Sequence, residues 1–299
     1  MDDRSSLRRD AVAYMAVALA GLCWSGNHIL GRAIAGHIPP VAISMLRWAI
    51  PALILLPFAL PHLRRDAPLL RAHFWIIAFL ATTGGAIFGT LQYVGLQYTT
   101  AINVSVLNSM APVLIIAAGM MIFGDTVTWR QVVGIAVSLT GVLAIVAKGN
   151  LGVLVALDVN WGDLVIIFNQ GIFAVYSAYL RLRPKIHWLS FTFTMAAISA
   201  LVTAPAMLIE HLSGNQLQLT WETLAAIGYV SIFPSVVATV AWIRGVDLIG
   251  QGRAGAMLHL IALYSAVLAS LLLGERLMPF HFVGFALIIG GVWLAARKG

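Results

Sequence analysis

The side chains of this sequence that could bind or transform a molecule stand inside long apolar stretches. Trp24, Asn27 and His28 lie at positions i, i+3 and i+4, so a helix would place them on one face. Amides and imidazoles can bind the polar groups of a small molecule, and aromatic rings can hold its apolar body. The pattern predicts a substrate-binding cavity formed by Trp24, Asn27, His28, Tyr93, Asn108, Asn169, Tyr176, Trp242, His259 and Tyr264.

Each of these residues also has an interpretation that involves no ligand. Asn and Ser in membrane helices often form hydrogen bonds between helices, worth about 0.6 kcal/mol on average. Trp24 and Trp242 could pack against neighbouring helices or lipid. Arg47 is a basic residue inside an apolar stretch, and we expect it to be structural, either paired or extended towards the membrane surface. The sequence alone leaves these alternatives open.

Catalytic chemistry has less support in the sequence. The chain has no Gly-rich loop followed by Lys and Ser or Thr, no Cys/His metal spacing and no nucleophile elbow. Gly250, Gly252 and Gly255 match the dinucleotide pattern G-x-G-x-x-G, but they open an apolar stretch and do not join a strand to a helix. An intramembrane enzyme would have to combine a candidate histidine with a nearby serine. We expect a protein that is not an enzyme and that uses no cofactor and no metal.

The composition is that of a membrane protein. Hydrophobic residues make up 61% of the chain and charged residues 10%, against about 25% charged residues in a soluble domain. Stretches of about 20 apolar residues are long enough to cross a bilayer as helices. The sequence predicts an all-α integral membrane protein with ten transmembrane helices, near residues 11–31, 40–60, 73–93, 99–120, 130–147, 161–181, 188–209, 220–243, 251–273 and 278–296.

The chain contains an internal duplication. A shift of 150 residues superposes residues 124–149 on 274–299 without a gap, so that Gly134 coincides with Gly284 and Gly141 with Gly291. A repeat of this size predicts two five-helix units, residues 1–150 and 151–299. Within each unit the two glycines are seven residues apart on one helix face, which predicts close helix packing.

The distribution of charge predicts the orientation in the membrane. Lys and Arg are absent from residues 72–129 and 186–243, each a predicted helix–loop–helix that passes through one face of the membrane. The positive-inside rule then places both termini in the cytoplasm, and because each unit has an odd number of helices, the second unit is inverted relative to the first.

The acidic residues bear on energy coupling. The Asp and Glu residues fall in the tail, in connections or near helix ends, so the sequence predicts that any transport is facilitated diffusion without ion coupling. The sequence shows no clustered basic face, so we do not expect the protein to bind nucleic acid.

Three segments carry a family resemblance: LLLGERLMPFHFVGFALIIGGVWL (271–294), its weaker copy MIFGDTVTWRQVVGIAVSLTGVLAIV (121–146) and LNSMAPVLIIAAGM (107–120). With the five-plus-five pattern they resemble the drug/metabolite transporter (DMT) superfamily, specifically its EamA-type members, over nearly the whole chain. Within the superfamily the chain is most similar to the YddG-type aromatic amino acid exporters. The proline usual in the third segment is present as Pro112, whereas Ala262 stands at the equivalent place in the second copy.

The resemblance implies a carrier in a bacterial inner membrane that exports small neutral or zwitterionic metabolites, aromatic amino acids foremost, by alternating access. Its partners would be the small-molecule substrate and the lipid bilayer. Two alternatives stay open at this point. One is a passive pore for small solutes, and the other is a carrier for drugs, nucleosides or other amino acids. The oligomeric state also stays open.

Overall fold

The computed structural model describes residues 3–34, 37–99, 104, 107–147, 160–273 and 278–296. This described part of the chain is helical and contains no strand, which confirms the predicted all-α class. The predicted boundary between the two units, at residue 150, lies outside the described residues. The α-helices are α1 (Asp3–Ala33), α2 (Pro40–Ala72), α3 (Phe74–Leu80), α4 (Phe88–Tyr98), α6 (Ala111–Phe123), α7 (Trp129–Val146), α9 (Trp161–Tyr179), α10 (Trp188–Leu212), α11 (Trp221–Ile232), α12 (Ala238–Ile249), α13 (Gln251–Ala256), α14 (Leu260–Leu273) and α15 (Pro279–Ala296).

Six helical segments of the described chain are long and apolar enough to cross a membrane: Asp10–Gly31, Pro40–Ala72, Phe74–Tyr98, Trp161–Leu182, Trp188–Leu212 and Trp221–Ile249. Shorter apolar helices cover Ala111–Phe123, Trp129–Ile145 and Pro279–Ala295. Large apolar side chains cover the outside of the bundle, where Trp75 is 82% and Met121 86% exposed. An apolar exterior of this kind is stable in lipid and costly in water.

Two of these segments contain a π-helical turn. The turn η1 (Ala81–Ile87) joins α3 to α4, and the turn η3 (Phe233–Val237) joins α11 to α12. Their last residues, Ile87 and Val237, are 150 positions apart, the interval of the sequence duplication. A π-turn widens the helix locally and often occurs at functional sites.

The helix α2 is longer than the predicted span of residues 40–60. The helix continues through Arg64 and Arg65, beyond the predicted span, and ends at Ala72. The extension is anchored because a carboxylate oxygen of Asp66 accepts a hydrogen bond from the backbone N–H of His187 at 2.9 Å. At its other end, α2 begins where the carboxylate of Glu210 accepts the backbone N–H groups of Val41 and Ala42.

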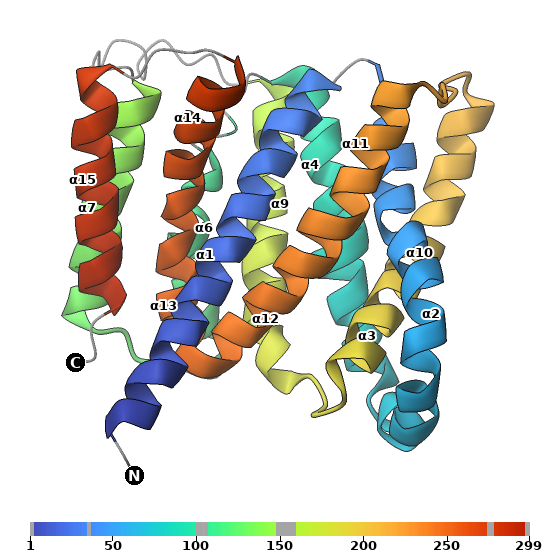
Figure 1. Cartoon of the computed structure of the whole chain (residues 1–299), viewed down its shortest axis with the longest axis horizontal. Coiled ribbons are helices and arrows are strands. Elements are labelled where there is room, and N and C mark those ends of the chain that lie inside the picture. Colours follow the sequence, from blue (N-terminus) through green and yellow to red (C-terminus); the bar gives the residue numbers. More distant parts are fainter. Residues whose placement is uncertain are drawn as a thin grey trace.

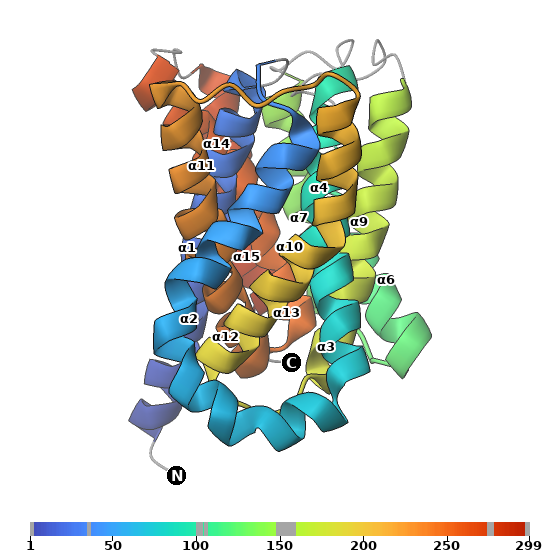
Figure 2. The same ribbon diagram turned by 90° about the vertical axis from the view of Figure 1, so that its right-hand side faces the viewer.

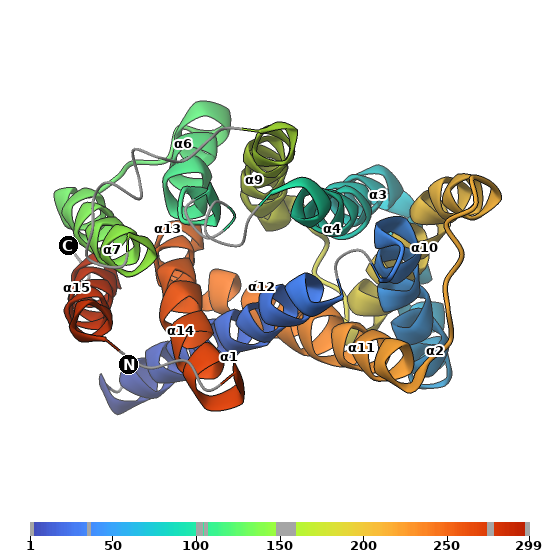
Figure 3. The ribbon, with the colours of Figure 1, turned by 90° about the horizontal axis from the view of Figure 1, so that it is seen from above.

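The bundle has two ends, and α1 begins at the same end at which α15 finishes (Figure 1). We call this the terminal end. The helices pack largely as pairs, with α7 against α15, α2 against α10, α1 against α12 and α4 against α9. Seen from above, α7 and α15 form one edge of the bundle and α2 with α10 the other (Figure 3). Figure 2 shows the α2–α10 edge face on.

Glycines permit the closest of these contacts. A Cβ atom built on Gly134 would lie 2.5 Å from the carbonyl oxygen of Gly291, and one on Gly141 would lie 2.7 Å from the carbonyl oxygen of Gly284. These distances are too short for any side chain, so the prediction that the four glycines serve helix packing is confirmed. The helices α7 and α15 run antiparallel, because Gly134 meets the later of the two α15 glycines.

Candidate substrate-binding site

A cavity of about 550 Å³, including its mouth, lies between helices from both halves of the chain. The cavity is lined by Trp24, Asn27, His28, Arg47, Phe88, Gln92, Asn108, Ala111, Gln170, Phe173, Leu258 and Ile261.

On α1 and α4, an aromatic residue is followed one helical turn later by a polar one. Trp24 precedes His28 by four residues, and Phe88 precedes Gln92 by four. A rise of about 1.5 Å per residue separates the members of each pair by about 6 Å along the helix. Both helices run away from the terminal end (Figure 1), so on each of them the aromatic ring lies nearer to that end.

The helix α9 repeats this order in the opposite chain direction. It runs antiparallel to α4, because Asn169 donates to the carbonyl oxygen of Phe88 at 3.0 Å whereas Thr99 donates to Asp163. Gln170 therefore lies farther from the terminal end than Phe173. Together the three helices form an aromatic layer (Trp24, Phe88 and Phe173) and, one turn farther from the terminal end, a polar layer (Asn27, His28, Gln92 and Gln170).

The rings of the aromatic layer contact one another. The ring centroids of Phe88 and Phe173 are 4.8 Å apart, and the Trp24 ring meets Phe173 edge-on at 6.0 Å. Trp242 is 1% exposed and packs behind this layer, 5.7 Å from Trp24 and 5.8 Å from Phe173. The indole N–H of Trp24 donates to the carbonyl oxygen of Pro234 in η3 at 3.3 Å, which fixes the plane of the ring.

Hydrogen bonds orient two amides of the polar layer, those of Asn27 and Gln170. The hydroxyl of Tyr93 donates to Oδ1 of Asn27 at 2.6 Å, which leaves the NH₂ group of Asn27 able to donate to a ligand. On the opposite side, Nε2 of Gln170 donates to Oδ1 of Asn108. The cavity thus offers neutral hydrogen-bond donors and acceptors beside a cluster of aromatic rings.

Arg47 adds a positive charge to the same cavity. The side chain is 5% exposed, and its Nε donates to the hydroxyl oxygen of Ser235 at 2.9 Å. The sequence led us to expect a paired or outward-extended arginine. The structure instead places Arg47 on the cavity wall, among uncharged groups.

A second cavity of about 350 Å³ adjoins the first and shares with it His28, Asn108, Leu258 and Ile261. Its wall also includes His259, which is 1% exposed. Nε2 of His259 donates to the carbonyl oxygen of Ser109 at 2.9 Å, and Nδ1 accepts from the hydroxyl of Ser138. Both ring nitrogens are therefore occupied within the protein. Among the described residues no cluster of three His, Cys, Asp or Glu side chains could hold a metal ion.

The structure brings together half of the predicted site residues. Trp24, Asn27, His28 and Asn108 line the larger cavity, and His259 lines the smaller one. The other five support these walls from behind. Tyr93 holds Asn27, Asn169 joins α9 to α4, Tyr176 packs on Phe173 at 5.9 Å, Trp242 backs the aromatic layer, and Tyr264 packs against the backbone at Gly21.

The prediction omitted five lining residues that carry polar or aromatic groups: Arg47, Phe88, Gln92, Gln170 and Phe173. Periodicity could have found Phe173, because it lies one turn beyond the candidate Asn169. Arg47 and Phe88 carry no such signal. Their place on the wall depends on which face of α2 and α4 the tertiary packing turns inward.

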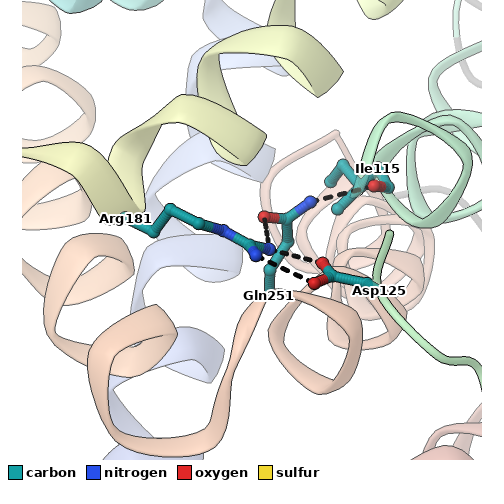
Figure 4. A network of polar contacts seen from close by, with 4 residues as sticks. All are labelled: Ile115, Asp125, Arg181 and Gln251. Atoms are coloured by element: carbon teal, nitrogen blue, oxygen red, sulfur yellow. Dashed lines mark hydrogen bonds and ion pairs between the residues drawn. The ribbon is translucent and has the colours of Figure 1, made fainter. Parts of the chain in front are cut away.

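Ion pairs connect the helices at the terminal end. Both guanidinium Nη atoms of Arg181, just after α9, donate to the carboxylate of Asp125 in the α6–α7 connection. Gln251 at the start of α13 accepts from Arg181 at 3.4 Å and donates to the carbonyl oxygen of Ile115 at 2.9 Å (Figure 4). The hydrogen bonds from Arg181 hold the pKa of the Asp125 carboxyl below its usual range. A further pair joins Arg183 to Asp247.

Several proteins of similar sequence are named as transporters. The chain is 25% identical over 287 residues to an uncharacterized transporter of Archaeoglobus fulgidus, covering 95% of this chain and 97% of that one. It is 23% identical over 295 residues to the uncharacterized transporter YetK of Bacillus subtilis, covering 98% and 89%. A protein of Streptantibioticus cattleyicolor named "Probable terminal-alkyne amino-acid exporter" is 27% identical over 236 residues, covering 78% and 74%.

A solved crystal structure has the same fold, with a TM-score of 0.76 at 18% identity and coverage of 95% of this chain and 96% of that one. The sequence model of the EamA-like transporter family matches this chain twice, over residues 11–147 and 160–297. The two matches take in every helix that lines the cavity and both partners of the Arg181–Asp125 ion pair. Because these matches cover most of the chain, the protein belongs to the EamA-like transporter family.

Proposed function

We propose that the protein is a carrier that exports small neutral or zwitterionic metabolites, aromatic amino acids foremost, by alternating access. The observation that carries the proposal is the layered cavity. Trp24, Phe88 and Phe173 form an aromatic layer that suits a planar ring, and neutral amides lie one turn away. A free aromatic amino acid has the same two parts, a ring and a polar head, separated by a few bonds.

The relative named as an amino-acid exporter supports both the substrate class and the outward direction of flux. The described lining residues support a neutral or zwitterionic substrate, because Arg47 is the one Lys or Arg among them. Sugar phosphates and nucleotides carry two or more negative charges, and binding sites for them commonly use several cations.

The proposal includes the membrane topology: ten transmembrane helices in two inverted repeats, residues 1–150 and 151–299, in the inner membrane with both termini cytoplasmic. Three observations support it. The family description matches each half separately, α7 and α15 meet through glycines that coincide under the 150-residue shift, and α1 begins at the end where α15 finishes. Alternating access would move one repeat against the other around the cavity.

The ion pairs at the terminal end favour a carrier over a passive pore. Gln251 lies about 10–15 Å from Leu258 and Ile261 along one nearly continuous helix, so the Arg181–Asp125–Gln251 network lies between the cavity and the terminal end. A permanently open pore would need a free path there. In a carrier, these contacts would form when that end is closed and break when it opens.

The test is flux by the purified full chain in liposomes, with a panel of labelled amino acids, nucleosides and sugar phosphates. The expected result is saturable flux of phenylalanine and tryptophan, accelerated by unlabelled substrate on the opposite side. Saturable flux of a sugar phosphate with none of phenylalanine would overturn the substrate class. Unsaturable flux of all small solutes would favour the pore.

A further inference from the structure

Arg47 is a buried cation, and the groups that it contacts in the described part of the chain are uncharged. Its Nε donates to the hydroxyl oxygen of Ser235 at 2.9 Å. The guanidinium carbon lies 5.5 Å from the centre of the Trp48 ring and 5.8 Å from that of the Tyr93 ring. Aromatic faces attract a cation, but neither they nor a hydroxyl neutralise its charge.

The ion pairs in the described part of the chain lie elsewhere. Arg181 pairs with Asp125 and Arg183 with Asp247, both outside the cavity, and Arg47 is in neither pair. A charged side chain at membrane depth is costly unless it meets an opposite charge or a water-filled cavity. Arg47 lines the substrate cavity, so the opposite charge can come from a bound ligand.

We infer that Arg47 binds the carboxylate of the transported molecule, an inference that rests on the proposed carrier function. The planar guanidinium can form two parallel hydrogen bonds to a carboxylate, a geometry that a single ammonium group cannot match. Because Arg47 is the one Lys or Arg among the described residues of the wall, the cavity suits a single carboxylate and not a phosphate dianion.

The position of Arg47 fits the two layers of the cavity. Its Nη1 would lie 3.5 Å from a Cβ atom at Gly89, which places the guanidinium beside α4 between Phe88 and Gln92. A carboxylate bound there reaches the level of the polar layer. An aromatic side chain attached to it then extends towards the terminal end, against the rings of Phe88 and Phe173, which contact each other. The bound substrate would therefore have a defined orientation, with its carboxylate away from the terminal end.

Ser235 is the positioning residue for this contact. It lies in the π-turn η3, and its hydroxyl donates to the carbonyl oxygen of Val230 at 2.7 Å. Since the hydroxyl hydrogen is used there, the oxygen is left to accept from Nε of Arg47. The π-turn thus fixes the position of Nε and with it the rotation of the guanidinium.

The first arm of the test uses the wild-type protein in liposomes and needs no substitution. Competitors of labelled phenylalanine flux would be 3-phenylpropionate, which keeps the carboxylate, and phenylalaninamide and phenethylamine, which lack it. Losing a hydrogen bond to a charged group weakens binding by about 10- to 100-fold. We expect the two compounds without a carboxylate to compete about 10- to 100-fold less well than 3-phenylpropionate. Equal competition by all three would overturn the inference.

The second arm compares variants at the same site. Arg47→Gln removes the charge but can still bond to Ser235, Arg47→Lys keeps the charge without the planar fork, and Ser235→Ala releases the guanidinium. Arg71→Gln on the exposed end of α2 is the matched control. We expect Arg47→Gln to equalise competition by the acid and the amide, Arg47→Lys and Ser235→Ala to have intermediate effects, and Arg71→Gln to have none. A preference for the acid that survives in Arg47→Gln contradicts the inference.

Two further readouts keep the result decisive. If Arg47→Gln does not fold, Ser235→Ala and the wild-type competition series carry the test. If phenylalanine shows no saturable flux, the proposed function fails by itself, and carboxylate binding is then measured by thermal shift with a series of other monocarboxylates. A rise in melting temperature in the wild type that is smaller in Arg47→Lys supports the role of Arg47. An equal rise in both, or none in either, refutes it.

Discussion

Gly134 on α7 faces the backbone carbonyl of Gly291 on α15, so closely that a Cβ atom at Gly134 would lie 2.5 Å from that oxygen. The relationship recurs two turns away, where Gly141 faces Gly284 at 2.7 Å. Under the 150-residue shift, Gly291 corresponds to Gly141 and Gly284 corresponds to Gly134. Each of the two contacts therefore maps onto the other, and the interface is self-complementary in the manner of a two-fold dimer. This geometry is the one that the proposed pair of inverted repeats would produce.

The close approach of α7 and α15 predicts a position-specific effect on stability. Gly291→Ala would place a methyl group 2.5 Å from the carbonyl oxygen of Gly134, and such overpacking costs about 1–3 kcal/mol. Gly290→Ala is the matched control, since nothing lies within 4 Å of its Cβ position and alanine favours a helix. The measurement is the melting temperature in detergent. We expect a lower value for Gly291→Ala only, and equal melting temperatures would contradict the packing role.

The aromatic layer predicts a loss of transport without a loss of folding. Trp24→Ala removes one wall of the cavity and the contact with the ring of Phe173, so the concentration needed for half-maximal flux of phenylalanine should rise about tenfold or more. Trp75→Ala is the control, because Trp75 is 82% exposed and touches no cavity. Both variants should elute as folded protein. Unchanged flux in Trp24→Ala would remove this residue from the binding site.

The Arg181–Asp125 ion pair predicts a pH dependence of stability. Arg181 lowers the pKa of the Asp125 carboxyl, so the pair contributes its full stability at pH values above the unfolded pKa of about 3.9. The contribution is lost as the pH falls through the lowered pKa of the folded state. The difference in melting temperature between the wild type and Asp125→Asn should therefore stay constant from pH 8 to pH 5 and shrink in more acidic buffer. A difference that disappears already at pH 6 would contradict this assignment.

The same ion pair predicts the effect of a charge exchange. Asp125→Arg and Arg181→Asp each place two like charges at the terminal end, where the wild type has a bidentate pair. Each single variant should transport more slowly, because the closed terminal end is weakened. The double variant Asp125→Arg/Arg181→Asp should recover part of the rate, since it restores opposite charges. Effects of the two substitutions that simply add would show that the residues act independently.

The positions of the carboxylates predict transport without ion coupling. Asp163 is the buried carboxylate of the described chain, and it serves the cap of α9 by accepting from the backbone N–H of Asn160 at 2.9 Å. It lies at the start of that helix, nearly two turns from the cavity residue Gln170. We expect liposomes with an imposed proton or sodium gradient, and no substrate gradient, to accumulate no phenylalanine. Accumulation that an ionophore abolishes would show that a coupling group exists.

The elements of the fold follow from local properties of the sequence. Apolar runs of about 20 residues can satisfy their backbone in lipid only as helices, and the sequence shows them directly. The 150-residue shift identified Gly134 and Gly141 as packing residues, because two turns on one helix face is a property of the chain itself. The four-residue spacing of Trp24 and His28 likewise placed both on one wall. The continuation of α2 beyond residue 60 was not predicted, since a run of charged residues such as Arg64–Asp66 can be a helix or a loop.

Tertiary structure decided which polar groups face the cavity. Asn169 and Gln170 are neighbours in sequence, yet Asn169 joins α9 to α4 while Gln170 lines the cavity, because one residue turns a helix by about 100°. Arg47 shows the same limit. Its neighbours Ser235 and Tyr93 are 188 and 46 positions away, so only the packing of η3 and α4 against α2 could show that the charge lies in the cavity and has no carboxylate partner in the described chain.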